Sequence, residues 1–220
     1  DTATFFFLMI RRPQRSTLCP YTTLFRSRTG EIDWIVPISL GDSHHGFRVM
    51  GTTPDYFRHY RYRRTRTLDF AQGVPFGDLF DAVLGADVAA QLGYQVGDKI
   101  IVAHGLGSTG FLEHDDKPFQ VSGILAKTGT PVDRTVHVSL EAVEAIHVDW
   151  QSGARIPGQS VSADEVRKMT LKPKAITAAL IGLKSKLAVF KLQRAINEYR
   201  AEPGSRSEER RVGKECRSRW

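Results

Sequence analysis

The sequence predicts an α+β fold, in which a mixed sheet is combined with short helices. Short apolar runs recur along the chain between glycine, proline, aspartate and serine residues, which is typical of strands joined by turns. Short helical patterns stand among these runs rather than in a separate block. Residues 186–199 carry the clearest helical pattern, with Val189, Leu192, Ile196 and Tyr199 on one side. We expect that apolar stripe to lie on a sheet.

The two ends of the chain match translated sequencing adapter. Leu24–Ser27 are encoded by CTCTTCCGATCT, and Arg206–Glu209 are encoded by its reverse complement, AGATCGGAAGAG. One oligonucleotide would then flank the insert in both orientations. We therefore predict that residues 1–27 and 206–220 are adapter-derived and form no domain. The biological segment is expected to be residues 28–205, a fragment that could hold one domain or two small subdomains.

Removing these ends changes what the composition indicates. The net charge of +7 suggests nucleic acid or an anionic membrane as partner, but the ends contribute +3 each, which leaves +1 for residues 28–205. Cys19 and Cys216 are the only cysteines and both lie in the ends. Disulfide scaffolds, thiolate nucleophiles and cysteine-ligated zinc are therefore excluded for the segment. It also contains no run of roughly 18 to 20 apolar residues, the length of a membrane span, so we expect it to be soluble.

The first elements of the segment are predicted to be strands followed by short helices. Strands are expected at 34–40 and 47–52, each bounded by turn residues. Thr53 is the expected N-cap of a helical turn over 56–60, with Pro54 at its first position.

The middle of the segment alternates strands with helices. The run at 82–84 predicts a buried strand, and the helix after it is expected to place Val88, Gln91 and Leu92 on one side before Gly93 ends it. The remaining expected elements are strands at 99–103, 119–125 and 135–139, a helix at 140–147, a linker or long loop at 150–164, and strands at 166–171 and 175–183.

Gly105–Gly110 matches the dinucleotide fingerprint G-x-G-x-x-G letter for letter. That fingerprint requires a helix at its third glycine, so that amide groups face a pyrophosphate. Residues 111–118 instead end in a turn, and no acidic residue stands about twenty positions on, near Lys127. A flexible hairpin loop is the preferred interpretation. A soluble enzyme or ligand-binding domain that uses this loop stays open as an alternative.

Arg58–Arg66 interleaves five arginines with Tyr60 and Tyr62. This composition is typical of surfaces that bind phosphates and stack bases. Because residues 28–205 are almost neutral, a solvated edge with arginine stems over apolar surface is the preferred interpretation. A nucleic-acid-binding module and a membrane-proximal face are the alternatives.

No group of residues predicts a reaction or a metal centre. No histidine pair has the H-E-x-x-H spacing, and the chain has neither a G-x-S-x-G elbow nor a phosphate-binding P-loop. The acid pairs Asp164-Glu165 and Glu113 with Asp115 lie in turn-like contexts where solvation is expected. We predict no enzyme and no catalytic, cofactor-binding or metal-binding residue. The histidines considered are His44, His45, His59, His104, His114, His137 and His147.

Three stretches together resemble the MacB-like periplasmic core domain of FtsX-type ABC transporter permeases. They are Phe47–Phe57 (FRVMGTTPDYF), Ala82–Ala103 (AVLGADVAAQLGYQVGDKIIVA) and Phe119–Leu140 (FQVSGILAKTGTPVDRTVHVSL). Asp133 stands at the place of the family's acidic residue before a strand. The order and spacing of the three stretches are more specific than any one of them.

The resemblance implies a porter-like α+β subdomain and a smaller β-rich lobe, inserted between the first two of four membrane helices. It implies a bacterial inner membrane permease with this segment in the periplasm, acting in export or mechanotransmission without catalysis of its own. The implied partners are the membrane helices of the same permease, a separate cytoplasmic ATPase subunit, a second permease copy and a periplasmic protein, but no nucleic acid. The helix at 186–199 would return the chain to the second membrane helix. Residues 105–118 and 150–164 match nothing in the family and are the expected place of partner-specific contacts.

Overall fold

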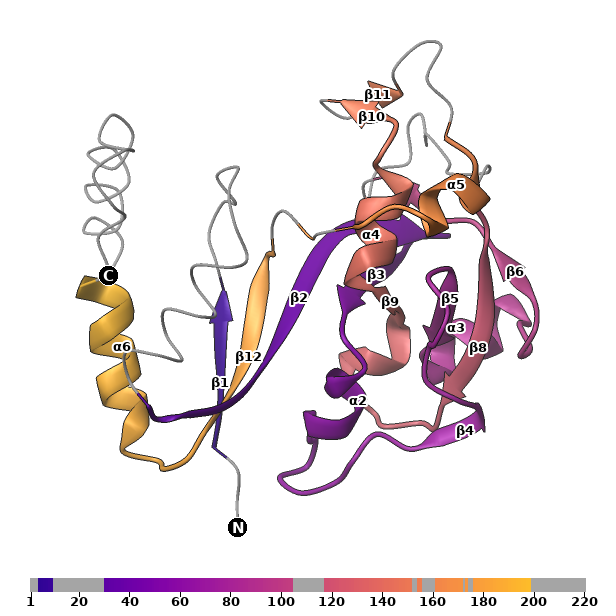
Figure 1. Cartoon of the computed structure of the whole chain (residues 1–220). Helices are drawn as coiled ribbons and strands as arrows, with labels where there is room; N and C mark the ends of the chain where they lie inside the picture. Colours follow the sequence, from indigo (N-terminus) through magenta and orange to yellow (C-terminus); the bar gives the residue numbers. More distant parts are fainter. Residues whose placement is uncertain are drawn as a thin grey trace.

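The computed structural model describes residues 4–9, 30–104, 117–151, 154–155, 161–171, 173 and 176–198. Most of their strands belong to one mixed sheet with the order β1-β12-β2-β3-β9-β5-β8-β4, flanked by short helices (Figure 1). Two short strands join it off this path, β6 beside β8 and β7 beside β2, and β10 pairs with β11 in a separate small sheet. The predicted α+β fold with a mixed sheet is confirmed.

The bounds of the elements are as follows. The strands are β1 Thr4–Met9, β2 Ile32–His44, β3 Phe47–Thr52, β4 Phe70–Gly73, β5 Asp81–Leu84, β6 Lys99–Ile100, β7 Ala103–His104, β8 Phe119–Leu125, β9 Thr135–Ser139, β10 Trp150–Gln151, β11 Ala154–Arg155 and β12 Ala178–Leu183. The helices are α2 Asp55–His59, α3 Ala86–Leu92, the 3-10 helix η1 Pro131–Arg134, α4 Leu140–Ile146, α5 Ala163–Arg167 and α6 Ala188–Glu198.

The 13-residue strand β2 connects the two parts of the sheet. Its first part, Ile32–Ile38, pairs antiparallel with β12, and its second part, Ser39–His44, pairs antiparallel with β3. Figure 1 shows β2 as a long curved strand that runs from the side of β1, β12 and α6 to the side of β3. The register shifts between Leu40 and Ser43, which is where a bulge bends a strand.

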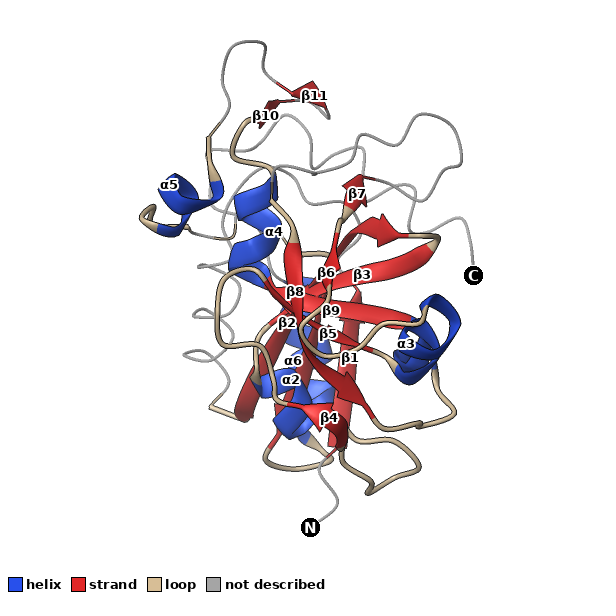
Figure 2. Cartoon of the chain, turned by 90° about the vertical axis from the view of Figure 1, so that its right-hand side faces the viewer, coloured by secondary structure: helices blue, strands red, loops and turns tan. Residues whose placement is uncertain are grey.

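The central strands are buried on both faces. In β5, Ala82 and Leu84 belong to one apolar cluster and Val83 to another, because successive side chains point to opposite faces of a sheet. The first cluster is covered by α3, α4 and α5, and the second by α2. Figures 1 and 2 both place α4 and α5 near each other, at the end of the molecule that carries β10 and β11.

A third apolar cluster forms between α6 and β12. Leu192 and Ala188 of α6 are buried against Ile181 and its neighbours, and Val189 is half-buried beside them. The predicted contact between this helix and a sheet is therefore confirmed for the described side chains. Tyr199 lies outside the described residues.

The predicted strand at 166–171 is wrong, because α5 occupies Ala163–Arg167. The reason is a capping box. The Ser162 hydroxyl accepts a hydrogen bond from the Glu165 amide at 3.3 Å, and the Glu165 carboxylate accepts one from the Ser162 amide at 2.9 Å. This reciprocal arrangement is a strong helix start, and it overrides the short apolar run after it.

The predicted cap of α2 is also wrong. Pro54, not Thr53, is the N-cap residue, and no side chain caps this helix. The Thr53 hydroxyl is buried and has no hydrogen-bond partner among the described residues, whereas the Thr53 carbonyl accepts from the Tyr56 amide at 2.9 Å. Proline at the cap position fixes the backbone of the first turn without a side-chain bond.

Two further expectations need correction. The strand predicted at 99–103 is divided, because Lys99–Ile100 pairs with β8 whereas Ala103–His104 pairs with β2. On α3, Gln91 is exposed, and Ala89 joins Val88 on the buried face. By contrast, the strands at 47–52, 119–125 and 135–139 have the predicted bounds.

Gly182 of β12 tests how closely the sheet is packed where β2 pairs with β12. It is the cross-strand partner of Trp34, and a Cβ added there would overlap the indole ring. The indole also stacks on His59, with ring centroids 4.3 Å apart. We expect Gly182→Ala to lower the free energy of unfolding by about 1–3 kcal/mol in urea denaturation. Gly41→Ala, where the added Cβ meets nothing within 4 Å, is the matched control; equal losses would contradict the prediction.

Candidate functional site

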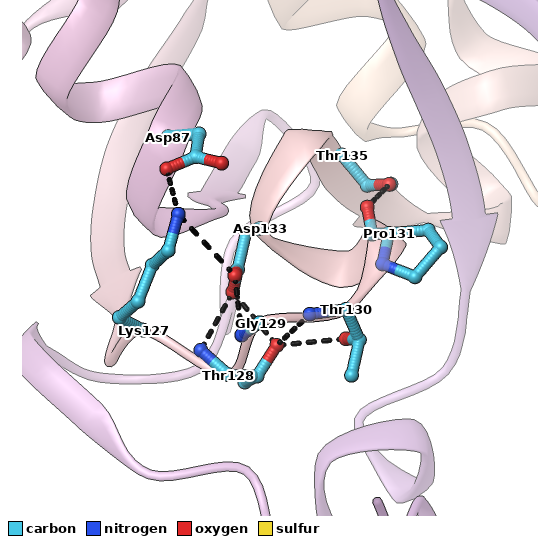
Figure 3. A network of polar contacts seen from close by, with 8 residues as sticks. All are labelled: Asp87, Lys127, Thr128, Gly129, Thr130, Pro131, Asp133 and Thr135. Carbon is cyan, nitrogen blue, oxygen red and sulfur yellow. Dashed lines mark hydrogen bonds and ion pairs between the residues drawn. The ribbon is translucent and has the colours of Figure 1, made fainter.

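A network of polar contacts surrounds Asp133 (Figure 3). We call it the Asp133 cluster, and it consists of Asp87, Lys127, Thr128, Gly129 and Asp133. The loop after β8 supplies Lys127, Thr128 and Gly129, η1 supplies Asp133, and α3 supplies Asp87. The backbone of Gly129 is left-handed, with φ +73°, which glycine adopts without strain.

The Asp133 carboxylate is buried and accepts three hydrogen bonds from two residues. Thr128 donates from its amide at 2.8 Å and from its hydroxyl at 2.7 Å, and the Gly129 amide donates at 2.7 Å. Burial would raise the pKa of Asp133, but these bonds and the nearby charge of Lys127 outweigh it, so the pKa lies below its ordinary value. Asp133 is therefore a charged structural anchor and no proton donor at neutral pH.

Lys127 joins this loop to helix α3. Its ammonium group donates to the Asp87 carboxylate and lies 3.6 Å from Asp133 Oδ2. The hydrogen bond to Asp87 raises the pKa of Lys127. Because Lys127 is exposed, this ion pair contributes little to the stability of the fold.

Gly85 places α3 directly on η1. Its amide donates to the Thr135 carbonyl at 2.9 Å, and a Cβ added to it would overlap the backbone of Val132 and Asp133. No larger residue fits between these two segments without moving the backbone. The Asp133 cluster is thus a close junction of β5, α3, η1 and β9.

A buried ion pair forms a second junction. Lys117 Nζ lies 3.2 and 3.1 Å from the two carboxylate oxygens of Asp149, and neither side chain is exposed. Lys117 comes just before β8, and Asp149 comes just after α4. Removing one partner of such a pair leaves a buried charge without compensation, which typically costs about 3–5 kcal/mol.

The end of β2 carries a buried polar run. His44 Nδ1 lies 2.6 Å from the Ile101 carbonyl oxygen, and Nε2 lies 3.1 Å from the Tyr94 hydroxyl. His147 Nε2 lies 3.6 Å from Asp42 Oδ1. Both nitrogens of His44 are thus engaged within the protein. In the part of the chain that the structure describes, no three histidine, cysteine or acidic side chains come together as a metal centre would require.

His137 is the most deeply buried histidine among those described. Its Nδ1 lies 3.2 Å from the Val83 carbonyl oxygen, its ring packs on Tyr56 and Phe57, and its Nε2 has no partner in the described residues. Burial lowers the pKa of His137 to about 4, against the raising effect of the bond with Val83. The ring is therefore neutral at pH 7.

The tyrosines of the Arg58–Arg66 run attach it to the apolar core. Tyr60 stacks on the buried Tyr56 with ring centroids 5.0 Å apart, and Tyr62 also packs on the second apolar cluster. Both rings are half-buried against the core, which leaves less of their surface for bases to stack on. This arrangement favours the preferred interpretation of Arg58–Arg66, which is a solvated edge with arginine stems over apolar surface.

Other sequence-based candidates lie outside the description. Gly105–Gly110 and His114 are not among the described residues, and neither is most of the 150–164 stretch. The Asp133 cluster was only partly foreseen, since Asp133 was singled out but Lys127 and Asp87 were not. The pairing of Lys117 with Asp149 was missed, because nothing local in the sequence connects residues so far apart.

The sequence matches the family described as MacB-like periplasmic core domain over residues 10–197. The chain belongs to this family. The matched range begins within residues 1–27 and ends before residues 206–220, whose adapter origin stays a prediction. Asp133 and the three stretches that carry the resemblance lie within the match. The chain is therefore a periplasmic domain of a MacB/FtsX-type ABC transporter permease, as the sequence predicts.

Two solved structures resemble this periplasmic core domain. The extracellular domain of the noncanonical ABC-type transporter YknZ from Gram-positive bacteria is 12% identical, with a TM-score of 0.47, and the similarity covers 84% of this chain and 86% of that one. The periplasmic region of MacB from Actinobacillus actinomycetemcomitans is also 12% identical, with a TM-score of 0.48, covering 89% and 83%. No curated protein matches the sequence. Among the described residues, no helix is both long and apolar enough to cross a membrane.

The Asp133 cluster can be tested by removing the charge alone. We expect Asp133→Asn to lower the free energy of unfolding by about 1–3 kcal/mol, because a buried carboxylate with charge-assisted bonds is lost. The folded-state pKa is depressed, so this stabilisation is present above the unfolded pKa and is lost as pH falls through the folded value. Urea denaturation at several pH values measures both effects. Asp69→Asn, at an exposed carboxylate, is the control, and a loss of equal size there would refute the assignment.

The stability of the domain is also expected to fall in acid because of His137, here because a neutral buried ring gains a positive charge. Since its folded pKa of about 4 lies below the ordinary value of 6.5, the unfolded chain binds its proton first. Stability from His137 is therefore complete above pH 6.5 and declines as pH falls towards 4, by about 3 kcal/mol in all. Between pH 7 and pH 4, the free energy of unfolding should fall more steeply with decreasing pH for the wild type than for His137→Phe. An equal fall in the free energy of unfolding for both proteins would show that His137 does not titrate in this way.

Proposed function

We propose that this domain relays conformational change between the membrane helices of its permease and the periplasm, for export or mechanotransmission. The observation that carries the proposal is the continuity of β2. One strand is hydrogen-bonded to β12 along its first part and to β3 along its second. A displacement at one end of the sheet therefore reaches the other through main-chain bonds rather than through a loop.

The two segments that would lead to the membrane helices lie side by side. The Lys191 ammonium group, on α6, donates to the Glu31 carboxylate at 2.8 Å. The Lys184 amide donates to the Glu31 carbonyl at 2.9 Å, and the Lys184 side chain donates to the Gly30 carbonyl at 2.8 Å. A movement of either membrane helix would thus act on the start of β2 and on α6 together.

The part of the sheet that contains β3, β9, β5, β8 and β4 is suited to move as a rigid body. The Asp133 cluster fixes α3 to η1, and the Lys117–Asp149 pair fixes the start of β8 to the end of α4. Packed interiors of this kind transmit displacement instead of absorbing it. We propose that a separate cytoplasmic ATPase subunit supplies the energy, and that two permease copies work together through rigid-body shifts.

We also propose that the domain performs no catalysis. The buried side chains of Asp133, Asp149 and His44 hold structural bonds, which supports this proposal. The proposed unit is residues 28–205, in the periplasm of a bacterial inner membrane permease. Strand β1 (Thr4–Met9) pairs with β12 over six residues but falls in the adapter-like segment, so we assign it no role.

Replacing residues 30–198 in a full-length permease with a short glycine and serine linker tests the proposal. We expect transport to be lost while the ATPase subunit still binds nucleotide and associates with the permease, because the relay is removed but the nucleotide site is not. Transport in vesicles and nucleotide binding are the measurements. Inserting the same linker after Gly77, in an exposed loop, is the control. Unchanged transport in the deletion variant would overturn the proposed relay.

A further inference from the structure

An exposed turn between α2 and β4 presents a group of arginines. Tyr62 and Arg66 exchange two backbone hydrogen bonds of 3.0 Å, which close the chain around Arg63 and Arg64. We call residues 62–66 the arginine turn. The half-buried ring of Tyr62 packs on the second apolar cluster and fixes the base of the turn to the core.

The five arginines of the Arg58–Arg66 run differ in the contacts that their side chains make. The Arg61 guanidinium donates to the carbonyls of Arg58 and Tyr60, at 2.6 and 2.9 Å, and so holds the backbone that leads into the turn. Arg58 lies 3.5 Å from the carboxylate of Asp55. The other three, Arg63, Arg64 and Arg66, are exposed, and within the described residues they have no acidic partner.

The backbone of the turn is strained where two of these side chains project. Arg63 has φ +45° and Arg64 has φ +77°, in the left-handed region that residues other than glycine and asparagine adopt at a cost of roughly 1–2 kcal/mol each. Such strain persists where the surroundings enforce it, and it is concentrated at functional sites. Arg63 also lies against the Asp133 cluster, because its Nη2 is 3.6 Å from the place of a Cβ on Gly129.

We propose that Arg63, Arg64 and Arg66 form a docking site for an acidic segment of a partner protein, rich in aspartate and glutamate. The guanidinium fork binds carboxylates through two parallel hydrogen bonds, which a lysine cannot do. These three exposed cations, which have no acidic partner among the described residues, lie on one turn and complement such a segment in charge. The inference goes beyond the proposed relay and does not depend on it.

The surroundings of the turn disfavour two other anionic partners. A bilayer surface is bound most firmly where basic residues stand beside exposed aromatic or large apolar side chains, whereas Tyr60 and Tyr62 are half-buried and pack on the second apolar cluster. Single-stranded nucleic acid needs exposed rings on which bases stack, whereas Tyr60 and Tyr62 pack on the second apolar cluster and His59 stacks on Trp34. Carboxylates need only the guanidinium groups.

Fluorescence anisotropy with a labelled peptide of alternating glutamate and glycine tests the site on the full chain. We expect the triple variant R63Q/R64Q/R66Q to bind about tenfold more weakly than the wild type, a loss that three exposed charge pairs can supply. The control is K99Q/K168Q/K186Q, which removes the same charge from exposed lysines elsewhere and should lose far less. The charge-preserving variant R63K/R64K/R66K should fall between them, because it lacks the planar fork.

Three outcomes would overturn the proposal. Equal losses in the arginine and lysine variants would show a general effect of net charge. Full binding by R63K/R64K/R66K would show that no guanidinium geometry is involved. Tighter, turn-dependent binding to vesicles of phosphatidylglycerol than to the peptide would identify a lipid surface as the partner.

A second variant separates docking from folding. We expect Arg64→Gly to weaken peptide binding without lowering the melting temperature, because glycine relieves the left-handed backbone while removing one guanidinium. A lower melting temperature with unchanged binding would mean that Arg64 is retained for stability alone, contrary to the proposal.

Discussion

The structure depends on the main-chain hydrogen bonds along β2. This strand pairs with β12 along its first part and with β3 along its second, so a single backbone connects the cluster under α6 to the two other apolar clusters. Neither part has a sheet of its own that is complete without β2. The bulge between Leu40 and Ser43 lets the strand bend from one pairing to the other. Any force that enters at α6 is therefore resisted by a ladder of bonds rather than by side-chain packing alone.

Polar groups inside this domain act as connectors. The Asp133 carboxylate, the Lys117–Asp149 pair and His44 each join segments distant in sequence, and each is satisfied within the protein. Their burial makes them costly to disrupt and poor as reactive groups. Function in this domain is thus expected at its exposed surfaces and its membrane-linked ends, which agrees with membership in a family of transporter periplasmic domains.

Much of the fold followed from the sequence, and the exceptions have physical reasons. The strands at 119–125 and 135–139 were predicted because both are short runs with apolar or β-branched residues, ended by turn or cap residues. The strand at 166–171 was wrong because a two-residue capping box decided the helix, and 99–103 was divided because its two halves pair with different strands. Pairings such as Lys117 with Asp149 depend on tertiary structure, which no local pattern contains. The sequence likewise could not show which arginines of the 58–66 run are already engaged.

The closeness of Glu31 to Lys184 and Lys191 has a consequence for how such a domain can be exchanged between proteins. A module whose first and last residues are neighbours occupies hardly more room in its host than a tight hairpin does. It can be grafted between two consecutive segments of a larger protein without forcing them apart. Evolution could therefore swap, enlarge or remove the whole periplasmic module while leaving the rest of the host protein as it was.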